Sequence, residues 1–578
     1  MKKPPPARPT ADGSRLWPIA LAVAVAAVIA YSPALRGEFL WDDDDYVSEN
    51  VTLATADGLR RIWFEPGAVI QYYPLTFTSF WVEYQLWGLD PTGYHVVNLA
   101  LHLATSLAVW WAFHILRFPG AWLVAALFAL HPIHVESVAW ITERKNVLSG
   151  LFYFLSAGFY LRAIRLSDEQ AGSKEKPLEI APYLVSLLLF LAALLSKTAT
   201  VTLPAALLLA VWWRRGRVGL RDVAPLIPYF ALSIALGLVT TVVEAEHVGA
   251  VGSQWTLSLL ERVLVAGRAV WFYAGKLAWP HPLVFIYPRW QIDSSSPLAY
   301  VFPLAAVLAA VGLYVARHRI GRGPLCAILF FGGTLVPILG FFDVYFMRFS
   351  FVADHFCYLA GVGLLALAAA GLTHERGLPR TARMVSIAMV LMACVALTWE
   401  RSHAFRDRET LWRDTLASNP GAWIAHSNLG AEFLKRGQIE PAAVELREAL
   451  RLNPRLDDAH NNLGVIATSQ GRSDEAIAHF EEAVRITPTF GAALLNLAVA
   501  LHGSGRIAEA IPRYEQALAT RGRDRRVQQA LPALHGNLGM ALESSGRGAE
   551  AVPHYREALR LNPQLTVVRE RLAVLEKR

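Results

Sequence analysis

The chain alternates long apolar segments with short polar loops up to about residue 399, and then becomes polar with a helical period. A helix needs roughly 20 mainly apolar residues to cross a bilayer. The pattern therefore predicts an all-α protein, a polytopic membrane helix bundle of about eleven spans followed by a helical soluble domain. The expected spans are 16–35, 96–116, 120–133, 147–163, 182–197, 200–213, 224–243, 298–316, 325–341, 355–372 and 383–399.

One further segment, residues 261–279, is apolar and aromatic but contains three cations, Arg262, Arg268 and Lys276. That mixture suits a helix lying in the membrane interface. A crossing here would also place the basic loop at 317–322 on the opposite side from the other basic loops. We interpret the segment as interfacial, and a twelfth crossing stays open as the alternative.

The polar C-terminal part is an internal repeat. The tripeptides at 428–430, 462–464 and 496–498 lie 34 residues apart (462 − 428 and 496 − 462), and the fourth, at 537–539, follows after 41 residues (537 − 496). About seven extra residues are therefore expected around 521–527. Alanines recur in register at 442, 476, 510 and 551, and again at 449, 483, 517 and 558. A period of about 34 residues with small side chains where two helices cross predicts a tetratricopeptide-repeat solenoid.

Each repeat carries an asparagine at the same place, which permits two interpretations. The four residues could form a ladder that binds the backbone of an extended peptide acceptor, or each could simply help to order its own helix pair. The residues are Asn428, Asn462, Asn496 and Asn537.

Charge fits a membrane protein better than a nucleic-acid-binding protein. The net charge is +7 (54 − 47), the chain is 54% hydrophobic and its mean hydropathy is +0.34. The basic residues gather in short loops between apolar segments, as they do in cytoplasmic loops of membrane proteins. Four loops are therefore expected on the cytoplasmic side. Their cations are Arg162, Arg165, Lys174 and Lys176; Arg214, Arg215, Arg217 and Arg221; Arg317, Arg319 and Arg322; and Arg376, Arg380 and Arg383.

The N-terminal residues 1–15 are basic and proline-rich, and precede the first apolar segment. An uncleaved anchor with a cytoplasmic tail is favoured over a cleaved signal peptide because many further spans follow. The three cysteines, at 326, 357 and 394, show neither disulfide nor metal spacing. With eleven spans, the first loop (36–95) and the repeats lie outside the cytoplasm, as in a multi-pass inner-membrane protein.

Several polar stretches should share this outer face. Ionisable residues at membrane depth are costly, so such residues are functional candidates. The stretches are the aspartate run Asp42, Asp43, Asp44 and Asp45, residues 131–146, Lys197, Arg348, and residues 354–358. Carboxylates and cations on one face suit a lipid-phosphate substrate, because cations hold the phosphate while a carboxylate deprotonates a hydroxyl.

Less specific interpretations exist for each stretch. Arg144, Lys145, Lys197 and Arg348 could be interface anchors that reach toward lipid headgroups. His131, His134 and Glu136 have a loose spacing for metal ligands, and hydrogen-bonded residues at a helix end fit it better. The aspartate run could be a solvated acidic loop or a divalent-cation site, so a metal requirement stays unknown.

Together these stretches resemble the transmembrane and tetratricopeptide-repeat (TMTC-like) proteins, a branch of the GT-C glycosyltransferases, over nearly the whole chain. No single motif is very specific, but the ordered set with the repeats is. The matching stretches are Asp42-Asp43 with Glu49-Asn50, Tyr73-Pro74-Leu75, residues 131–136 with Arg144-Lys145, Ser196-Lys197 with Pro204, residues 271–280, and Asp354 with Tyr358.

The resemblance, which is to a bacterial type of the family, implies an extracytoplasmic active site. It implies inverting transfer of a sugar such as mannose from a polyprenyl-phosphate donor to hydroxyls of protein acceptors, as in O-mannosylation, with the repeats binding the acceptor. It puts the first-loop acid on Asp42 or Asp43, and the phosphate contacts on Arg144 and Lys145, with Lys197, Arg348 and His355 next. Supporting residues would be Asp44, Asp45, His131, His134, Glu136, Asp354 and Tyr358.

Two departures from the family pattern matter. His355 stands where the family usually has arginine, so it supplies positive charge only when protonated. The acidic run also contains the additional Asp44 and Asp45, which obscures the identity of the base. Neighbouring aspartates would raise the proton affinity of that base.

The expected domains are a cytoplasmic tail (1–15), a membrane domain (16–400) and a repeat domain (401–578). Two other functions stay open. One is a transferase of the same fold that acts on a glycan or lipid acceptor. The other is a non-catalytic membrane scaffold that presents the repeats. In every case the partners would be the membrane and a ligand of the repeats, with no nucleic acid.

Overall fold

The computed structural model describes residues 17–65, 67–166, 177–243, 257–342, 344–374, 379–520 and 525–577. Helices are the only extended regular structure in these ranges, which confirms the predicted all-α class. The expected tail 1–15, the loop cations Lys174, Lys176 and Arg376, and residues 521–524 of the expected insertion lie outside the described residues. The chain divides into two compact units, Met1–Asn419 and Pro420–Arg578.

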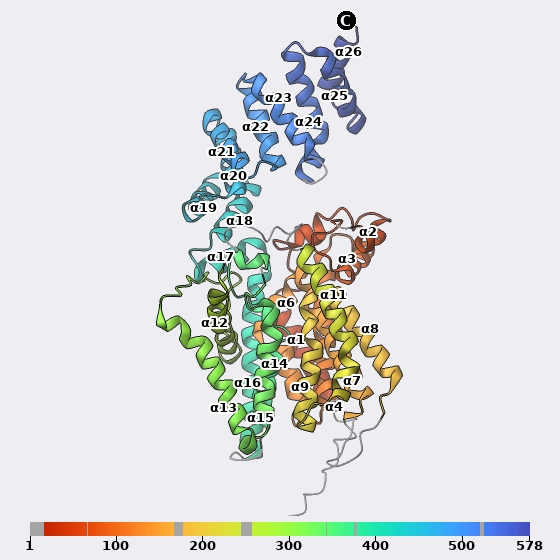
Figure 1. The fold of residues 1–578 in the computed structure, drawn as a ribbon. Coiled ribbons are helices and arrows are strands. Elements are labelled where there is room, and N and C mark those ends of the chain that lie inside the picture. The colour runs from red at the N-terminus through yellow and green to blue at the C-terminus, as the bar shows by residue number, and fades with distance from the viewer. Residues whose placement is uncertain are drawn as a thin grey trace, which may run out of the picture. The chain divides into compact units, whose positions relative to one another are not determined.

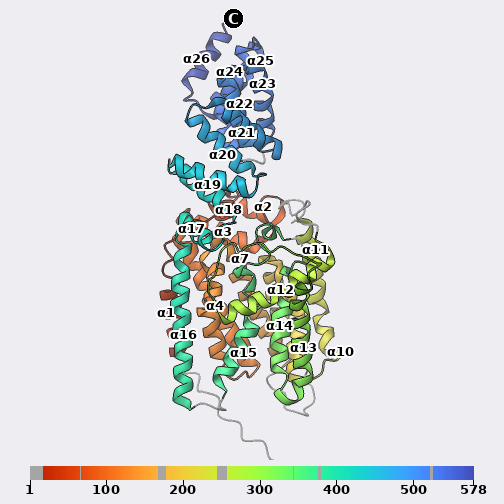
Figure 2. The same cartoon turned by 90° about the vertical axis from the view of Figure 1, so that its left-hand side faces the viewer.

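The first unit is a bundle whose longer helices run side by side (Figures 1 and 2). Among its longer helices are α4 (Pro91–Ile115), α7 (Arg144–Ala163), α11 (Ile227–Val243), α12 (Leu259–Ala278), α13 (Val301–Ile320) and α16 (Arg380–Ser402). Shorter helices fill the bundle: α1 (Trp17–Tyr31), α3 (Pro74–Trp87), α5 (Ala121–Leu130), α8 (Ile180–Ser196), α9 (Leu203–Arg215), α14 (Gly323–Leu335) and α15 (Gly361–Thr373). The remaining ones are α2 (Gly58–Phe64), α6 (Val135–Ala139), α10 (Leu220–Val223) and α17 (Arg408–Ser418).

Within the described part of the chain, four helical stretches are long and apolar enough to cross a membrane by themselves: Pro91–Ile115, Leu220–Val243, Pro297–Ile320 and Arg380–Phe405. The pair Ala121–Leu130 and Pro132–Ala139, bent by 54°, would make a fifth. About eleven spans were expected, and several of the others correspond to shorter apolar helices, such as Trp17–Tyr31 and Ile180–Ser196. A helix of 15 residues rises only about 22 Å, less than the roughly 30 Å of hydrocarbon, so turns at its ends would have to complete a crossing.

The bend after α5 sets the course of the polar segment 131–146. Pro132 lacks a backbone N–H and cannot continue the preceding helix. The chain instead makes a short 3₁₀ turn (Pro132–His134), the short helix α6 and a second 3₁₀ turn (Ile141–Glu143) before α7 begins at Arg144. Every residue from 131 to 146 is buried.

The second unit consists of helix pairs stacked on one another (Figure 1). The pairs are α18 (Trp423–Lys435) with α19 (Ile439–Leu452), α20 (Asp457–Ser469) with α21 (Ser473–Ile486), α22 (Gly491–Gly503) with α23 (Ile507–Ala519), and α24 (Arg525–Ser544) with α25 (Gly548–Leu561), followed by α26 (Thr566–Leu575).

The glycine of the Asn-Leu-Gly tripeptide lies where the two helices of a pair cross. A Cβ atom built on Gly464 would lie 2.5 Å from the Phe480 ring, and one on Gly539 would lie 2.6 Å from Tyr555. The alanines that recur in register are all buried. These small residues allow the close helix packing predicted from the repeat pattern.

The additional residues of the fourth repeat lengthen its first helix. Helix α24 has 20 residues, whereas the corresponding α20 and α22 have 13 each. At least part of the insertion therefore extends the first helix of the fourth repeat.

Candidate active site

The aspartate run follows a tryptophan in an unusual backbone conformation. Trp41 has a φ of +39°, in the left-handed region that residues other than glycine rarely adopt. Its ring stacks on Trp140 with centroids 5.8 Å apart. Three further rings meet it edge-on at 5.5 to 5.7 Å, those of Phe285, Phe349 and Trp412. Strained backbone held by such packing is typical of functional sites.

Asp43 is a structural residue. Its Oδ1 accepts hydrogen bonds from the backbone N (2.7 Å) and the hydroxyl (2.6 Å) of Thr142, and its Oδ2 accepts one from the backbone N of Leu40 (2.7 Å). Burial raises the pKa of Asp43 to about 7, although these hydrogen bonds oppose the shift. Asp43 thus fastens the first loop to the segment before α7.

Asp44 and Asp45 have different surroundings. Asp44 accepts hydrogen bonds from Arg408 of α17 (2.5 Å) and from Ser48 (2.7 Å), and Arg408 also donates to the backbone oxygen of Phe39 (2.9 Å). Asp45 is exposed. Asp44 therefore anchors the acidic loop to α17, and Asp45 faces solvent.

Asp42 has the surroundings of a proton acceptor. Its pKa is raised to about 7, chiefly by burial and also by the carboxylates of Asp45, Asp43 and Glu143, while the nearby Lys145 opposes the shift. Its side chain is only half-buried, so a ligand can reach it. A carboxyl group with this pKa is about half ionised near neutral pH, where a general base works best. Among the four aspartates, Asp42 best fits the role of a base.

Glu143 lies at the centre of a buried charge cluster. Its Oε1 is 3.0 Å from Lys145 Nζ and 3.9 Å from His355 Nε2, and its Oε2 is 3.3 Å from Lys197 Nζ. Burial alone would raise the pKa of Glu143, but the attraction of His355, Lys145 and Lys197 holds it well below its ordinary value. Glu143 is therefore a carboxylate that keeps three basic groups together.

Asn146 and Glu136 complete this cluster. The amide of Asn146 donates to Glu143 (2.5 Å) and accepts from Lys197 (2.7 Å). Glu136 accepts from His355 Nδ1 at 2.6 Å, which turns the other ring nitrogen of His355 toward Glu143. The cluster thus joins the segment before α7, the turn after α8 and the turn before α15.

Asp354 lies behind the cluster. It accepts a hydrogen bond from the hydroxyl of Tyr287 (2.8 Å), and its backbone N donates to Glu136 (3.1 Å). Burial and the charge of Glu136 raise its pKa well above the ordinary value. Asp354 supports the turn that presents His355.

Arg144 does not join Lys145. All five guanidinium N–H groups are engaged elsewhere: Nε donates to Asn98, Nη1 to Ser79 and Glu83, and Nη2 to Glu83 (3.1 Å) and the backbone oxygen of Tyr94 (2.9 Å). The side chain is fully buried. Arg144 forms an ion pair with Glu83, and its expected contact with a phosphate stays a prediction.

His131, His134 and Tyr358 pack in the interior. His131 accepts from the backbone N of Ile133 (3.3 Å) and contacts the backbone oxygen of Leu277 (3.1 Å). His134 lies among aromatic rings, and the centroids of its ring and that of Tyr358 are 5.1 Å apart. Within the described ranges, no group of three or more His, Cys, Asp or Glu side chains could hold a metal ion. These contacts favour the interpretation as helix-end residues over the metal-ligand interpretation.

Arg348 is half-buried beside the aromatic box, the rings of Trp140, Phe285, Phe349 and Trp412 around Trp41. Its guanidinium lies 5.3 Å from the ring centroids of Tyr345 and Phe349, and it donates to the Tyr345 hydroxyl at 2.8 Å. Since Phe349 touches Trp41, Arg348 belongs to the surroundings of the acidic loop.

The repeat asparagines share a half-buried position but differ in contacts. Asn428 donates to the backbone oxygen of Ile424 in its own helix (2.8 Å), whereas Asn496 donates to Asn461 of the preceding repeat (2.9 Å). Asn462 accepts a long contact from Asn461 (3.5 Å), and Asn537 is placed equivalently in α24. At least Asn428 and Asn496 are thus engaged in ordering the helices, and the ladder stays a prediction.

Three residues of the site were not predicted as such. Glu143 and Asn146 lie in the polar stretch 131–146 but have no spacing that marks them as a charge centre. Trp41 could not be predicted from the sequence, because its positive φ depends on its packing against rings from distant parts of the chain. The only indication available in the sequence was that Glu143 lies two residues before Lys145.

The comparisons with known proteins match both parts of the chain. The family described as "Tetratricopeptide repeat" matches residues 455–523 and 489–564, and "TPR repeat" matches residues 430–467. These matches confirm the predicted tetratricopeptide-repeat fold.

Curated relatives extend the similarity into the membrane unit. The human "Protein O-mannosyl-transferase TMTC4" is 25% identical over 72% of this chain and 64% of its own length. The Caenorhabditis elegans "Protein O-mannosyl-transferase F38B6.6" is 24% identical over 70% of this chain and 58% of its own length. The alignments thus span less than two thirds of either relative.

Among solved structures, one titled "Functional Characterization of Pseudomonas Aeruginosa pilF" is 27% identical, with a TM-score of 0.24, and the match covers 26% of this chain and 67% of that one. A structure of MamA protein is 20% identical with a TM-score of 0.23, over 26% of this chain and 79% of that one.

Proposed function

The chain is TMTC-like, a relative of the tetratricopeptide-repeat O-mannosyl-transferases, and from that premise we propose that it is a membrane glycosyltransferase. The donor is a polyprenyl-phosphate sugar, with mannose the sugar suggested by the names of the relatives. The acceptors are hydroxyl groups of proteins outside the cytoplasm. The observation that carries this proposal is Asp42, with its raised pKa, beside three basic groups gathered around Glu143.

In the proposed reaction Asp42 is the base. Its carboxylate accepts the proton of the acceptor hydroxyl as the hydroxyl oxygen bonds to the anomeric carbon of the sugar. The bond from that carbon to the phosphate oxygen breaks, and the polyprenyl phosphate leaves with the electron pair. Attack on the face opposite the phosphate inverts the anomeric centre.

The basic groups bind the leaving phosphate. Lys145 and Lys197 are ammonium groups held by Glu143, and His355 adds positive charge when protonated. Charge that develops on a leaving phosphate is stabilised most by cations that are already in position. Glu143 acts through Lys145 and Lys197 and is therefore a positioning residue.

The repeats bind the acceptor polypeptide. Stacked helix pairs form an extended surface of the kind that holds peptides. The asparagine at the same place in each repeat is the proposed backbone contact, although Asn428 also bonds within its own helix and Asn496 to the preceding repeat. The repeats and Asp42 lie on the same, extracytoplasmic side of the membrane in this proposal.

Two experiments test the function. Extracytoplasmic proteins of cells that lack the chain are analysed by mass spectrometry and should lack a hexose that the wild-type chain restores. The purified full-length chain is then given polyprenyl-phosphate mannose and those unmodified proteins, and should transfer the sugar. A chain truncated after residue 419 should bind the donor but fail to modify the proteins. Labelling of glycans or lipids in place of proteins would overturn the proposed acceptor, and no transfer from any polyprenyl-phosphate sugar would overturn the enzyme.

A further inference from the structure

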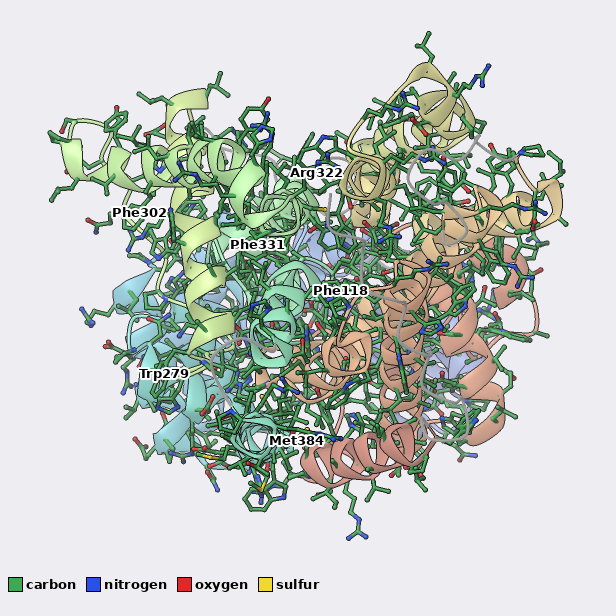
Figure 3. All side chains as sticks on the ribbon, turned by 90° about the horizontal axis from the view of Figure 1, so that it is seen from below. Phe118, Trp279, Phe302, Arg322, Phe331 and Met384 are labelled. Carbon is green, nitrogen blue, oxygen red and sulfur yellow. The ribbon has the colours of Figure 1, made fainter. Side chains whose placement is uncertain are left out.

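Two adjoining cavities lie at the end of the first unit opposite the charge cluster. Helix α7 begins next to Glu143, and the apolar cavity lies along its distant half, at residues 153–161, and along α9 at residues 203–213. Figure 3 looks at the bundle from this end and labels Phe118 and Arg322, which belong to this region. Neither cavity takes part in the proposed transfer reaction.

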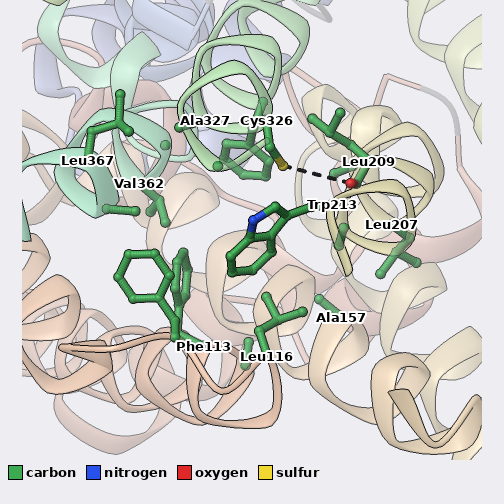
Figure 4. A pocket seen from close by; sticks show the side chains of 18 of the residues that line it. Phe113, Leu116, Ala157, Leu207, Leu209, Trp213, Cys326, Ala327, Val362 and Leu367 are labelled. Atoms are coloured by element: carbon green, nitrogen blue, oxygen red, sulfur yellow. Dashed lines mark hydrogen bonds between the residues drawn. The ribbon is translucent and has the colours of Figure 1, made fainter. Parts of the chain in front are cut away.

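The first cavity is apolar and measures about 310 Å³. It lies between helices from distant parts of the chain, α4, α7, α9, α14 and α15, as Figure 4 shows. Phe113, Trp213, Ala327 and Val362 face it, and the thiol of Cys326 is turned to the backbone oxygen of Leu209 at 3.7 Å. Such a lining accepts a hydrocarbon chain, and a dry cavity of this kind has no polar partners for water.

The second cavity, of about 580 Å³, is cationic. Its lining contains Arg317, Arg322 and His318, together with Trp212 and Tyr314, and the described lining has no carboxylate. Trp213 borders both cavities. The indole of Trp213 therefore stands between the polar cavity and the apolar one.

Contacts with neighbouring residues hold Arg317 and Arg322 in the lining of the second cavity. The guanidinium of Arg317 covers the Tyr314 ring, 3.6 Å from its centroid. The guanidinium of Arg322 lies over Gly216, where a Cβ atom would come within 2.3 Å of it. Gly216 has a φ of +79°, so glycine both forms the turn after α9 and leaves room for Arg322.

We propose that these cavities bind one anionic phospholipid, with its phosphate at Arg317 and Arg322 and one acyl chain in the apolar cavity. Two features identify this occupant. The arginines of the second cavity complement the negative phosphate, and the apolar cavity lies directly across Trp213, where it can take an acyl chain. Basic pockets between membrane helices bind anionic headgroups. Arginines that merely set topology would need no apolar cavity beside them.

The test uses the purified full-length chain in nanodiscs and native mass spectrometry of its retained lipids. Phosphatidylglycerol is the anionic probe, and phosphatidylcholine is the zwitterionic one. The wild-type chain should retain phosphatidylglycerol in preference. R317Q/R322Q should weaken retention about fivefold for each arginine lost, whereas R319Q, an exposed neighbour that lines neither cavity, should behave as wild type.

A second variant tests the hydrocarbon chamber. Ala206 lines it, so Ala206→Phe should fill part of the space and lower retention while both arginines remain. Each variant is compared with wild type by its thermal unfolding midpoint, and only variants that unfold cooperatively are interpreted. Equal retention of the two lipids by wild type, unchanged retention in R317Q/R322Q, or selective retention of polyprenyl phosphate in place of phospholipid would each overturn the proposal.

Discussion

Arg144 and Glu83 form a two-pronged ion pair inside the first unit, with Arg144 fully buried and both of its terminal nitrogens bonded to the same carboxylate. Arg144, which was expected to contact a phosphate, thus helps to hold the first unit together, and the phosphate contact stays a prediction. Its neighbour Lys145 points to Glu143, because successive residues of a helix are rotated by about 100°.

Removing one partner of this pair should destabilise the chain. Glu83→Gln leaves the buried guanidinium without its counter-charge, which typically costs about 3–5 kcal/mol. The double variant E83M/R144M should recover most of the loss, since a buried pair replaced by apolar side chains is often tolerated. Thermal unfolding in detergent gives the stability. If the stable double variant no longer bound polyprenyl-phosphate mannose, Arg144 would be a donor contact after all.

Glu143→Gln should weaken donor binding. The glutamine side chain lacks the negative charge that holds Lys145 and Lys197 in place. A small displacement of such binding groups can cost about 10²-fold in rate. The effect should appear in the KM for the polyprenyl-phosphate donor. Glu65→Gln is the control, because Glu65 makes only an exposed pair with Arg61, which contributes little. Equal donor KM values in the two variants would remove Glu143 from the site.

Trp412→Ala should disturb Asp42 from a distance. Trp412 touches the ring of Trp41, and loss of a buried tryptophan typically costs about 3–5 kcal/mol. The turnover number should fall while donor binding persists, because the lysines do not contact this ring. Trp399→Ala offers a matched control, as 46% of Trp399 is exposed. Full turnover in a folded Trp412→Ala chain would show that the aromatic box does not position the base.

The rate of transfer should depend on pH through Asp42. Its pKa is raised to about 7, so the carboxyl is protonated below that pH and cannot accept a proton. The turnover number should rise with pH and level off above about 7, falling about tenfold for each unit below it. A steady-state pH profile with saturating donor measures this. A rate that stays flat between about pH 5 and about pH 8 would contradict it.

The repeat array was predictable because its helix contacts form between residues that are close in the sequence. Glycine at 430, 464 and 539 and alanine at matching places leave room where helices cross, and that requirement recurs every 34 residues or so. The membrane unit was predictable as a class but not in its crossings. Proline breaks and polar first turns, as at Pro132 and Arg144, shorten helices in ways that hydropathy alone does not define.

The candidate site was likewise predictable only in part. The sequence singled out Lys145, Lys197 and His355, and the structure brings these three around one carboxylate. It did not separate Asp42 from Asp43, because the hydrogen bonds of Asp43 come from Thr142, 99 residues away. Glu143 was missed for a related reason, since its importance arises from a lysine 54 residues further along.

The most direct test of the account replaces single members of the aspartate run and measures sugar transfer from polyprenyl-phosphate mannose to protein acceptors. Asp42→Asn should lower the turnover number by about 10²–10⁴-fold, the usual contribution of a general base, with donor binding retained. Asp45→Asn, in the same run but exposed, should stay within about threefold of wild type. Transfer by Asp42→Asn at the rate of Asp45→Asn would contradict the central claim that Asp42 takes the proton.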